Sequence, residues 1–372
     1  MRLSLPRSRW SWRWGAFACG VAALACLPAA VAALPVGSGS LPPARLLARV
    51  LASTDAPYQG YAESFAGLGL PDLPRAGRVV ALLGGTTRMR VWAASSRDWR
   101  VDELSAVGER DLYHHLWGTE LWDSGQRRVT VTRGQPTVRL VRPADLLPPE
   151  LGRRLAAAAA PGELSALPGR RVAGVAAAGV RITPRSADTT IGRVDLWADP
   201  RSGLPLRVEV TARGAHGPLL TSGFLDLLQQ APPLRLLDFE PPPEADVDEV
   251  DAPDVAAEVD QRSPFVLPDA LAGQPRRASV ASAAGTYGRG FDLVAVLALP
   301  AWLSPRDDRF RKQVPEAAGP WGSASLAQTP LLNGMVFESG EVAYVLCGTV
   351  RPQLLERLAA QLARGGVQER PR

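Results

Sequence analysis

The sequence predicts an α+β protein in which an antiparallel β-sheet, with helices against one face, precedes a second, smaller α+β domain. Residues 86–134 alternate between apolar and polar side chains in short runs separated by turn residues. This pattern is typical of an antiparallel meander with one dry face. Residues 43–54 and 143–160 instead place apolar side chains at helical spacing. An acidic, proline-bearing stretch at 240–260 divides the chain.

The composition excludes a disordered chain and gives little support to a nucleic-acid partner. Hydrophobic residues make up 46% of the 372 residues, which is enough to form buried cores. Four of the basic residues are Arg2, Arg7, Arg9 and Arg13, and the rest of the chain carries 38 basic against 37 acidic residues. The formal charge of +5 is therefore mostly a property of the N-terminus, and no nucleic-acid partner is expected.

Residues 1–36 are expected to be a signal peptide or an N-terminal membrane anchor. Residues 1–14 contain four arginines and three tryptophans, and residues 15–36 contain no charge. Small residues at 30–33 suit cleavage, whereas tryptophan beside arginine favours an anchor at a membrane interface. Both alternatives place the rest of the chain in the cell envelope, outside the cytoplasm. Cys347 is the only cysteine beyond this segment, so no intrachain disulfide is expected there.

The first domain is expected to span residues 41–240 and to begin with the amphipathic helix at 43–54. Its first strand candidates are residues 88–94, 99–104, 111–117, 120–122 and 128–133. Because successive side chains of a strand point to opposite faces, Met89 and Val91 face one way and Trp92 the other. Two helical pieces within 143–160 would then cover the dry face.

Three more strand candidates lie in residues 170–210. The first runs from Val172 to Ile182. The other two, at 193–198 and 204–210, alternate and are joined by a turn that contains Pro200 and Gly203, which predicts a hairpin. Gly203 lies where this turn needs a positive φ, a backbone conformation that glycine adopts at low cost.

The order and spacing of the residues in this region resemble the periplasmic sigma-factor regulators of the MucB/RseB family. The resemblance is carried by Arg171-Val172-Ala173-Gly174, Pro184, Leu196-Trp197-x-Asp199 and Ser202-Gly203-Leu204-Pro205-Leu206-Arg207. It implies that the first domain has the fold of the lipoprotein carrier LolA, a curved antiparallel half-barrel with covering helices. It also implies a regulator that senses lipid and binds a membrane anti-sigma factor. The alternative is a LolA-like carrier of lipid or lipoprotein that works with an envelope transporter.

Residues 241–278 are expected to be an acidic, proline-rich linker, because 240–260 holds nine acids, four prolines and no base. Residues 279–365 are then expected to form a small α+β domain, with a late amphipathic helix that Pro352 opens. The pattern of this segment is similar to the second domain of the regulator family. The glycine-rich stretch 285–290 has no helix after it, so it is expected to be a loop without a nucleotide-binding role.

No catalytic constellation is apparent, and neither an enzyme nor a cofactor nor a metal is expected. His114 and His115 are adjacent on a strand, so they point to opposite faces and do not easily chelate one ion. The chain has no Gly-x-Ser-x-Gly, no paired cysteines, no phosphate-binding loop and no His-Glu-x-x-His. Catalytic carboxylates need not be visible in a sequence, so an enzyme stays the alternative.

The sheet is rich in tryptophan, which indicates either core packing or a cavity for an apolar ligand. If the dry face is only partly filled, an acyl chain could enter between the sheet and its helices. The candidate lining residues are Met89, Val91, Leu147, Leu151, Leu196 and Val208, with Trp92 at the rim. The expected partners are therefore a lipid or acyl chain, a membrane anti-sigma factor, and the membrane itself through the N-terminus.

Overall fold

The computed structural model describes residues 41–71, 77–106, 108–136, 139–252, 254–277, 279, 281–304, 313–365 and 367–369. The signal peptide or anchor expected at residues 1–36 lies outside these ranges and stays a prediction. Within the described ranges, none of the helices is both long enough and apolar enough to cross a bilayer.

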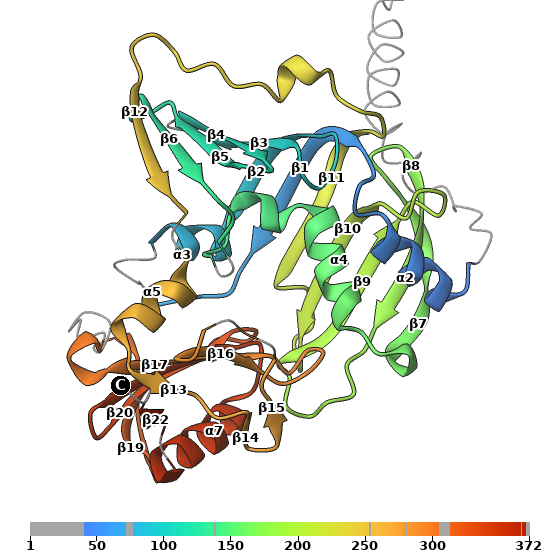
Figure 1. Ribbon diagram of the computed structural model, residues 1–372. Coiled ribbons are helices and arrows are strands. Elements are labelled where there is room, and N and C mark those ends of the chain that lie inside the picture. The colour runs from blue at the N-terminus through green and yellow to red at the C-terminus, as the bar shows by residue number, and fades with distance from the viewer. Residues whose placement is uncertain are drawn as a thin grey trace, which may run out of the picture.

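One open, curved sheet of twelve strands forms the first domain (Figure 1). Its strands are β1 (Tyr58–Ala66), β2 (Thr86–Ala93), β3 (Trp99–Ser105), β4 (Gly108–His115), β5 (Gly118–Asp123), β6 (Arg128–Arg133), β7 (Leu164–Val172), β8 (Val175–Ile182), β9 (Ile191–Ala198), β10 (Pro205–Ala212), β11 (Leu220–Leu228) and β12 (Asp246–Asp251). Their order is β12-β6-β5-β4-β3-β2-β1-β11-β10-β9-β8-β7, so β1 joins two meanders side by side. Every neighbouring pair is antiparallel except β12 and β6, which are parallel.

Side-chain alternation determines which face of the sheet is covered. In β2, Met89 and Val91 are buried while Arg88 and Arg90 are exposed, as the sequence pattern predicts. The helices of the first domain are α2 (Pro43–Ala52), α3 (Gly77–Leu83) and α4 (Pro148–Ala158), with 3-10 turns η1 (Pro143–Leu146), η2 (Pro161–Glu163) and η3 (Leu234–Leu236). The two helical pieces expected in 143–160 are η1 and α4. Helices α2 and α4 lie over strands β8 to β10 (Figure 1).

Helix α4 lies directly against the sheet because the residues that face the sheet have small side chains. A Cβ atom at Gly152 would be only 2.7 Å from the Cβ of Pro205 and 3.2 Å from the Cδ1 of Leu196. Ala156, one turn further along, is 1% exposed. Glycine and alanine at these positions therefore allow the helix backbone to approach β9 and β10 closely.

Two turns show how local sequence determines the hairpins of this region. Gly203 has φ +76°, as expected, and its N–H donates to the carbonyl of Asp199 at 2.8 Å. The expected strand from Val172 to Ile182 is instead divided between β7 and β8. Ala173 and Gly174 have φ +46° and +79°, which are the positive values that a two-residue hairpin turn requires.

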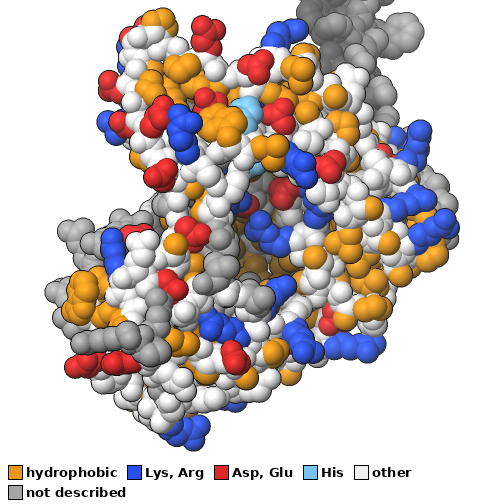
Figure 2. All heavy atoms as spheres, viewed as in Figure 1, with side chains coloured by type: hydrophobic (Ala, Val, Ile, Leu, Met, Phe, Trp, Pro, Cys, Tyr) orange, Lys and Arg blue, Asp and Glu red, His pale blue; other side chains and the backbone are white. Residues whose placement is uncertain are grey.

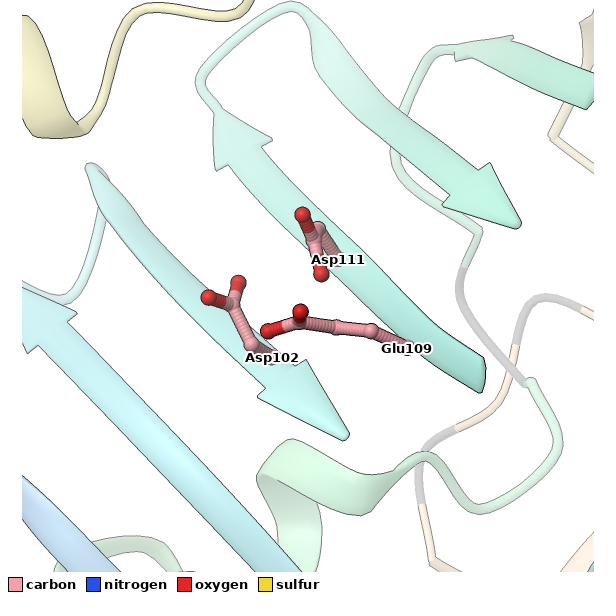
Figure 3. A group of neighbouring side chains, drawn as sticks. All are labelled: Asp102, Glu109 and Asp111. Carbon is pink, nitrogen blue, oxygen red and sulfur yellow. The ribbon is translucent and has the colours of Figure 1, made fainter. Parts of the chain in front are cut away.

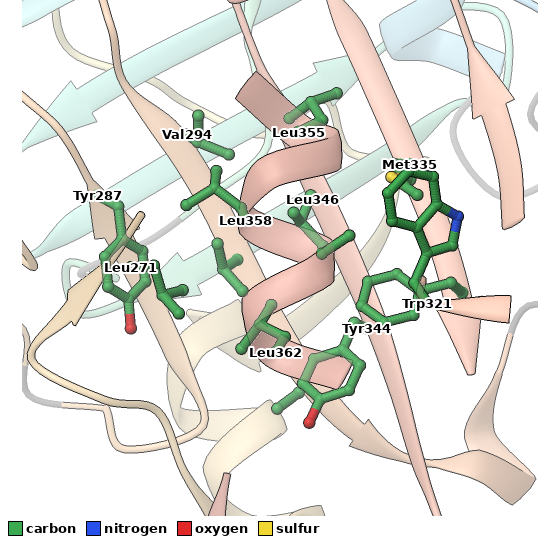
Figure 4. Packing of buried hydrophobic residues seen from close by; sticks show 14 of the residues in the cluster. Leu271, Tyr287, Val294, Trp321, Met335, Tyr344, Leu346, Leu355, Leu358 and Leu362 are labelled. Atoms are coloured by element: carbon green, nitrogen blue, oxygen red, sulfur yellow. The ribbon is translucent and has the colours of Figure 1, made fainter. Parts of the chain in front are cut away.

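The second domain is built on a six-stranded sheet with one long helix across it. Its elements are β16 (Ala284–Tyr287), β17 (Val294–Pro300), η4 (Ala301–Leu303), β18 (Glu316–Gly319), β19 (Gly322–Ala327), β20 (Asn333–Ser339), β21 (Val342–Gly348) and α7 (Pro352–Gly365), and the strand order is β16-β17-β21-β20-β19-β18. Figure 4 shows Leu355, Leu358 and Leu362 of α7 packed over Leu346 and Tyr344. This apolar helix face, repeated at helical spacing, forms the core of the domain.

The structure differs from the linker expected at 241–278, because most of this segment belongs to one domain or the other. It contains β12, α5 (Val255–Arg262), β13 (Phe265–Val266), β14 (Ala270–Leu271) and β15 (Gln274–Pro275), and β13 pairs with β22 (Gln368–Glu369). Phe265, Leu267 and Leu271 are buried in the core of the second domain, so its packing begins before residue 279. The acidic residues of β12 stay exposed, as expected, but its backbone pairs with β6.

Hydrogen bonds join the two domains where the β8–β9 loop meets the ends of the second sheet. The N–H of Thr190 donates to the carbonyl of Thr349 at 3.0 Å, and the N–H of Arg351 donates to the carbonyl of Asp188 at 2.7 Å. Phe291 and Leu331 of the second domain are buried in the core cluster of the first. This junction holds the domains side by side.

Candidate functional site

Six of the seven predicted lining residues lie in two adjoining apolar clusters under the helices. Leu151, Leu196 and Val208 pack between α4 and strands β9 and β10, together with residues of α2. Met89, Val91 and Leu147 pack in the neighbouring cluster. Leu83 and Leu220 pack against both clusters. The structure thus brings the six side chains onto one face of the sheet, where all of them are buried.

Trp92 does not lie at the rim of that face. It points to the opposite side of the sheet from Met89 and Val91, where the guanidinium of Arg100 lies 4.9 Å from the centre of its ring. Strand alternation is the reason, since Trp92 directly follows Val91 in β2. Trp92 is therefore a cation–π partner of Arg100.

The two adjacent histidines also have separate surroundings. His114 stacks on Trp99 with ring centres 4.8 Å apart, and burial lowers the pKa of His114 to about 4. The Nδ1 atom of His115 lies 3.0 Å from a carboxylate oxygen of Asp98. The two rings thus have different partners, as their positions on a strand predict.

Three carboxylates gather on the face that carries Trp92, a grouping that the sequence did not reveal. Asp102 of β3 and Glu109 and Asp111 of β4 each offer an oxygen atom within 4.8 Å of the others (Figure 3). Asp102 and Asp111 are directly paired across the two strands. Only this register brings them together, because they are nine positions apart in the chain.

Arg100 is the counterion of this acidic group. Its Nε donates to Asp102 at 2.6 Å, and one of its terminal nitrogens donates to Asp111 at 3.1 Å. Burial and the nearby charge of Asp102 raise the pKa of Asp111 to about 7, because both disfavour the ionised form. The second carboxylate oxygen of Asp111 is buried without a hydrogen-bond partner. The group is therefore a buried charge network that still carries excess negative charge when all three acids are ionised.

A basic cleft of about 490 Å³ lies between the two domains. Its lining consists of Arg154, Ala157, Ala158, Pro275, Arg276, Arg277, Gly288, Arg289, Gly290 and Leu293. Four of these residues are arginines and none is acidic. Figure 2 shows basic side chains gathered around the hollow where the two domains face each other.

Gly290 brings the second domain close to α4 at one end of this cleft. A Cβ atom at Gly290 would be 2.9 Å from the carbonyl oxygen of Ala158, and the φ of Gly290 is +55°. Gly288 has φ +100°, and a Cβ atom there would be 2.1 Å from the carbonyl oxygen of Asp292. The glycine-rich stretch 285–290, expected to be a loop, is a strand in its first half, because residues 285–287 belong to β16 and only 288–290 form the turn before β17. The contact of Gly290 with α4 is a close approach of two backbones.

The four arginines differ in how far they are already engaged. Arg276 donates to the carbonyls of Leu267, Ser282 and Ala284 at 2.9 to 3.1 Å, so it stabilises the second domain. Arg154 reaches Asp145 at 3.1 Å but is 59% exposed in its side chain. Arg277 and Arg289 are exposed, and no ion pair to either is found among the described residues. In the sequence, the features that could have indicated this site are the two adjacent arginines at 276–277 and the glycines at 285–290.

Comparison with known proteins gives matches among solved structures alone. No protein-family model matches the chain, and no curated protein matches it. The crystal structure of MucB in complex with MucA(peri) is 17% identical with a TM-score of 0.46, over 89% of this chain and 100% of that chain. Among solved structures, the chain is similar to MucB. The complex of MucA and MucB from Pseudomonas aeruginosa is 18% identical with a TM-score of 0.47, over 88% of this chain and 98% of that chain.

A LolA superfamily protein from Nitrosomonas europaea also matches. It is 12% identical with a TM-score of 0.20, over 54% of this chain and 99% of that chain. MucB belongs to the family that the residues at 171–207 resemble in sequence, and LolA gives its name to the fold which that resemblance implies for the first domain.

Proposed function

We propose that this chain is a non-catalytic cell-envelope protein, an extracytoplasmic sigma-factor regulator that binds an anti-sigma factor and senses lipid. The observation that carries the proposal is the junction of the two domains, which leaves a basic cleft between a helix-covered sheet and a second sheet. Such a cleft favours binding of a partner, because hydrogen bonds between the domains fix the positions of the two surfaces that line it, so less conformational entropy is lost on binding. The resemblance at residues 171–207 supplies the class of partner, a membrane anti-sigma factor.

Lipid sensing would occur between α4 and the sheet, where Leu151, Leu196 and Val208 lie, and would extend toward the neighbouring cluster of Met89, Val91 and Leu147. In this structure the side chains there are packed, so an acyl chain enters only if α4 moves outward. Each buried methylene contributes about 0.8 kcal/mol, which offsets the loss of contacts between the helix and the sheet. Because the end of α4 also lines the interdomain cleft, a movement of α4 would change the surface offered to a protein partner.

The proposal is tested with the purified chain and a fluorescent fatty-acyl probe. Binding should quench tryptophan fluorescence at micromolar probe, and native mass spectrometry should find lipid that co-purifies. Leu151→Gln should weaken probe binding about tenfold, since it places a polar group in the apolar layer. Leu225→Gln, at a 60% exposed leucine, is the matched control and should leave binding unchanged. If the purified protein carries no lipid and does not bind the probe at tens of micromolar, lipid sensing is contradicted.

The second candidate function is a LolA-like carrier of lipid or lipoprotein, working with an envelope transporter. The extent of the two adjoining apolar clusters favours it, because together they offer room for more than one acyl chain if α4 moves. The two functions differ in what happens to the ligand. A carrier should transfer a bound acyl probe to acceptor vesicles within minutes. A regulator should keep the probe bound, and the affinity of the protein for the anti-sigma factor should change when the probe binds.

A further inference from the structure

We propose that the interdomain cleft binds an acidic peptide segment, and that Arg277, Arg289 and Arg154 hold its carboxylates. This inference rests on the proposed function in one respect, namely that the segment belongs to the regulated partner. It adds the site and the chemistry of recognition. The cleft has four arginines and no acidic residue in its lining, so an occupant with negative charge is required for charge complementarity.

Three of the four arginines are able to take part. Arg276 is committed to backbone carbonyls of its own domain. Arg277 and Arg289 are exposed, and Arg154 shares Asp145 with Arg139, which lies closer at 2.7 Å. Asp145 therefore keeps a partner if Arg154 turns to an incoming carboxylate. Guanidinium groups bind carboxylates with two parallel hydrogen bonds, which gives the contact direction as well as energy.

The arrangement favours an extended peptide over a single phosphate group. Arg154 comes from α4, Arg277 follows β15, and Arg289 lies between β16 and β17, so the three cations come from three different segments. The cleft has a volume of about 490 Å³. One water molecule occupies about 30 Å³, so a single small anion would fill only part of the cleft. The end of α4 in the cleft is its C-terminus. Backbone N–H groups at a helix N-terminus, the usual cradle of phosphate, are not what α4 presents.

The chain itself shows how arginines hold an acidic extended segment. Arg127, Arg128 and Arg133 pair with Glu244, Asp248 and Glu249 at 2.8, 3.4 and 2.9 Å, along the parallel strands β6 and β12. Exposed pairs of this kind contribute less than about 1 kcal/mol each. A segment in the cleft therefore needs several carboxylates together with burial of its backbone between the domains.

The test uses the full chain and a fluorescein-labelled synthetic peptide of alternating glutamate and alanine, with fluorescence anisotropy as the readout. The peptide should bind at low salt, and a peptide with glutamine in place of glutamate should not. The double variant Arg277→Gln/Arg289→Gln should weaken binding about tenfold and reduce its dependence on salt. The matched control Arg45→Gln/Arg235→Gln changes two exposed arginines outside the cleft and should keep the affinity of the unchanged chain.

Several outcomes would overturn the inference. An equal loss of affinity in both double variants would mean general charge attraction, and no binding at millimolar peptide would mean an empty cleft. Competition by millimolar inorganic phosphate, or by phosphatidylglycerol vesicles but not by neutral vesicles, would assign the cleft to phosphate groups instead. The acyl probe is measured on the same variants, which should bind it normally. If the unchanged chain binds the acyl probe but not the acidic peptide, only this inference is refuted. If the unchanged chain does not bind the acyl probe, the proposed lipid sensing is refuted.

Discussion

At the scale of single residues, Gly203 combines two constraints that can be separated by mutation. Its φ is +76°, and a Cβ atom there would lie 2.2 Å from the carbonyl oxygen of Arg49. A positive φ alone costs other residues roughly 1 kcal/mol. The contact with Arg49 adds to this cost, because the turn then pushes against the end of α2.

We therefore expect Gly203→Ala to lower the melting temperature of the first domain by more than Gly214→Ala. Gly214 has a similar φ of +80°, but nothing lies within 4 Å of a Cβ atom there, so it reports the conformational cost alone. Differential scanning calorimetry should show a difference of several degrees, corresponding to about 1–2 kcal/mol. Equal melting temperatures for the two variants would mean that α2 moves aside at no cost.

Asp111 is the second residue with a testable consequence. Its pKa is raised from 3.8 to about 7 by burial and by Asp102. As the pH rises from 4 to 7, the unfolded chain releases this proton while the folded chain keeps it. The folded state binds more protons than the unfolded state in that window, so the free energy of unfolding falls as the pH rises.

Asp111→Asn should remove this pH dependence. Relative to the unchanged chain, the variant should gain stability by about 3 kcal/mol between pH 4.5 and pH 8, as measured by urea denaturation at both values. Asp226→Asn, at an exposed aspartate, is the control and should show a stability difference that does not vary with pH. A constant difference for Asp111→Asn as well would mean that Arg100 keeps Asp111 ionised at acid pH.

At the scale of elements, strand β12 is held to the sheet by contacts that salt can weaken. All six of its residues are exposed, and its acidic side chains form ion pairs with arginines of β6 at the surface. Such pairs are screened at high ionic strength. The strand therefore depends mainly on its backbone hydrogen bonds.

We expect limited proteolysis to cut first between residues 240 and 260, and the rate to rise about twofold in high salt. Arg128→Gln/Arg133→Gln should give the faster rate already at low salt, because it removes two of the ion pairs. Arg88→Gln/Arg90→Gln, on exposed arginines of β2, should leave the rate unchanged. Gel electrophoresis and mass spectrometry identify the cuts, and first cuts scattered through 86–134 would contradict the prediction.

At the scale of the whole molecule, location is the property on which the proposed function depends. The arginine-rich start and the uncharged residues 15–36 predict that everything from residue 41 onward lies outside the cytoplasm. Protease added to intact spheroplasts should degrade this part of the chain, while a cytoplasmic marker protein survives. Mass spectrometry of the N-terminus then distinguishes cleavage from anchoring. Full protection of the chain would refute export.

The sequence by itself determined the features that depend on neighbouring residues. The two-residue periodicity of β2, β9 and β10 indicated which side chains are buried, because alternation places Met89, Leu196 and Val208 on a single face of their strands. Gly203 marked its turn through the need for a positive φ. Helical spacing and early prolines located η1, α4 and α7 to within a few residues. These signals are local, so they survive without knowledge of the fold.

Only the tertiary structure decided which of these faces and segments meet. Periodicity states that Asp102 and Asp111 each point away from the dry face, but the register of β3 against β4 places them together. The acidic stretch looked like a linker because its charges exclude it from a core, yet backbone pairing and surface ion pairs make it an edge strand. Arg154 and Arg289 meet across the cleft because the β8–β9 loop docks on the second sheet. Such contacts join residues far apart in the chain, and side-chain pattern specifies orientation but not neighbours.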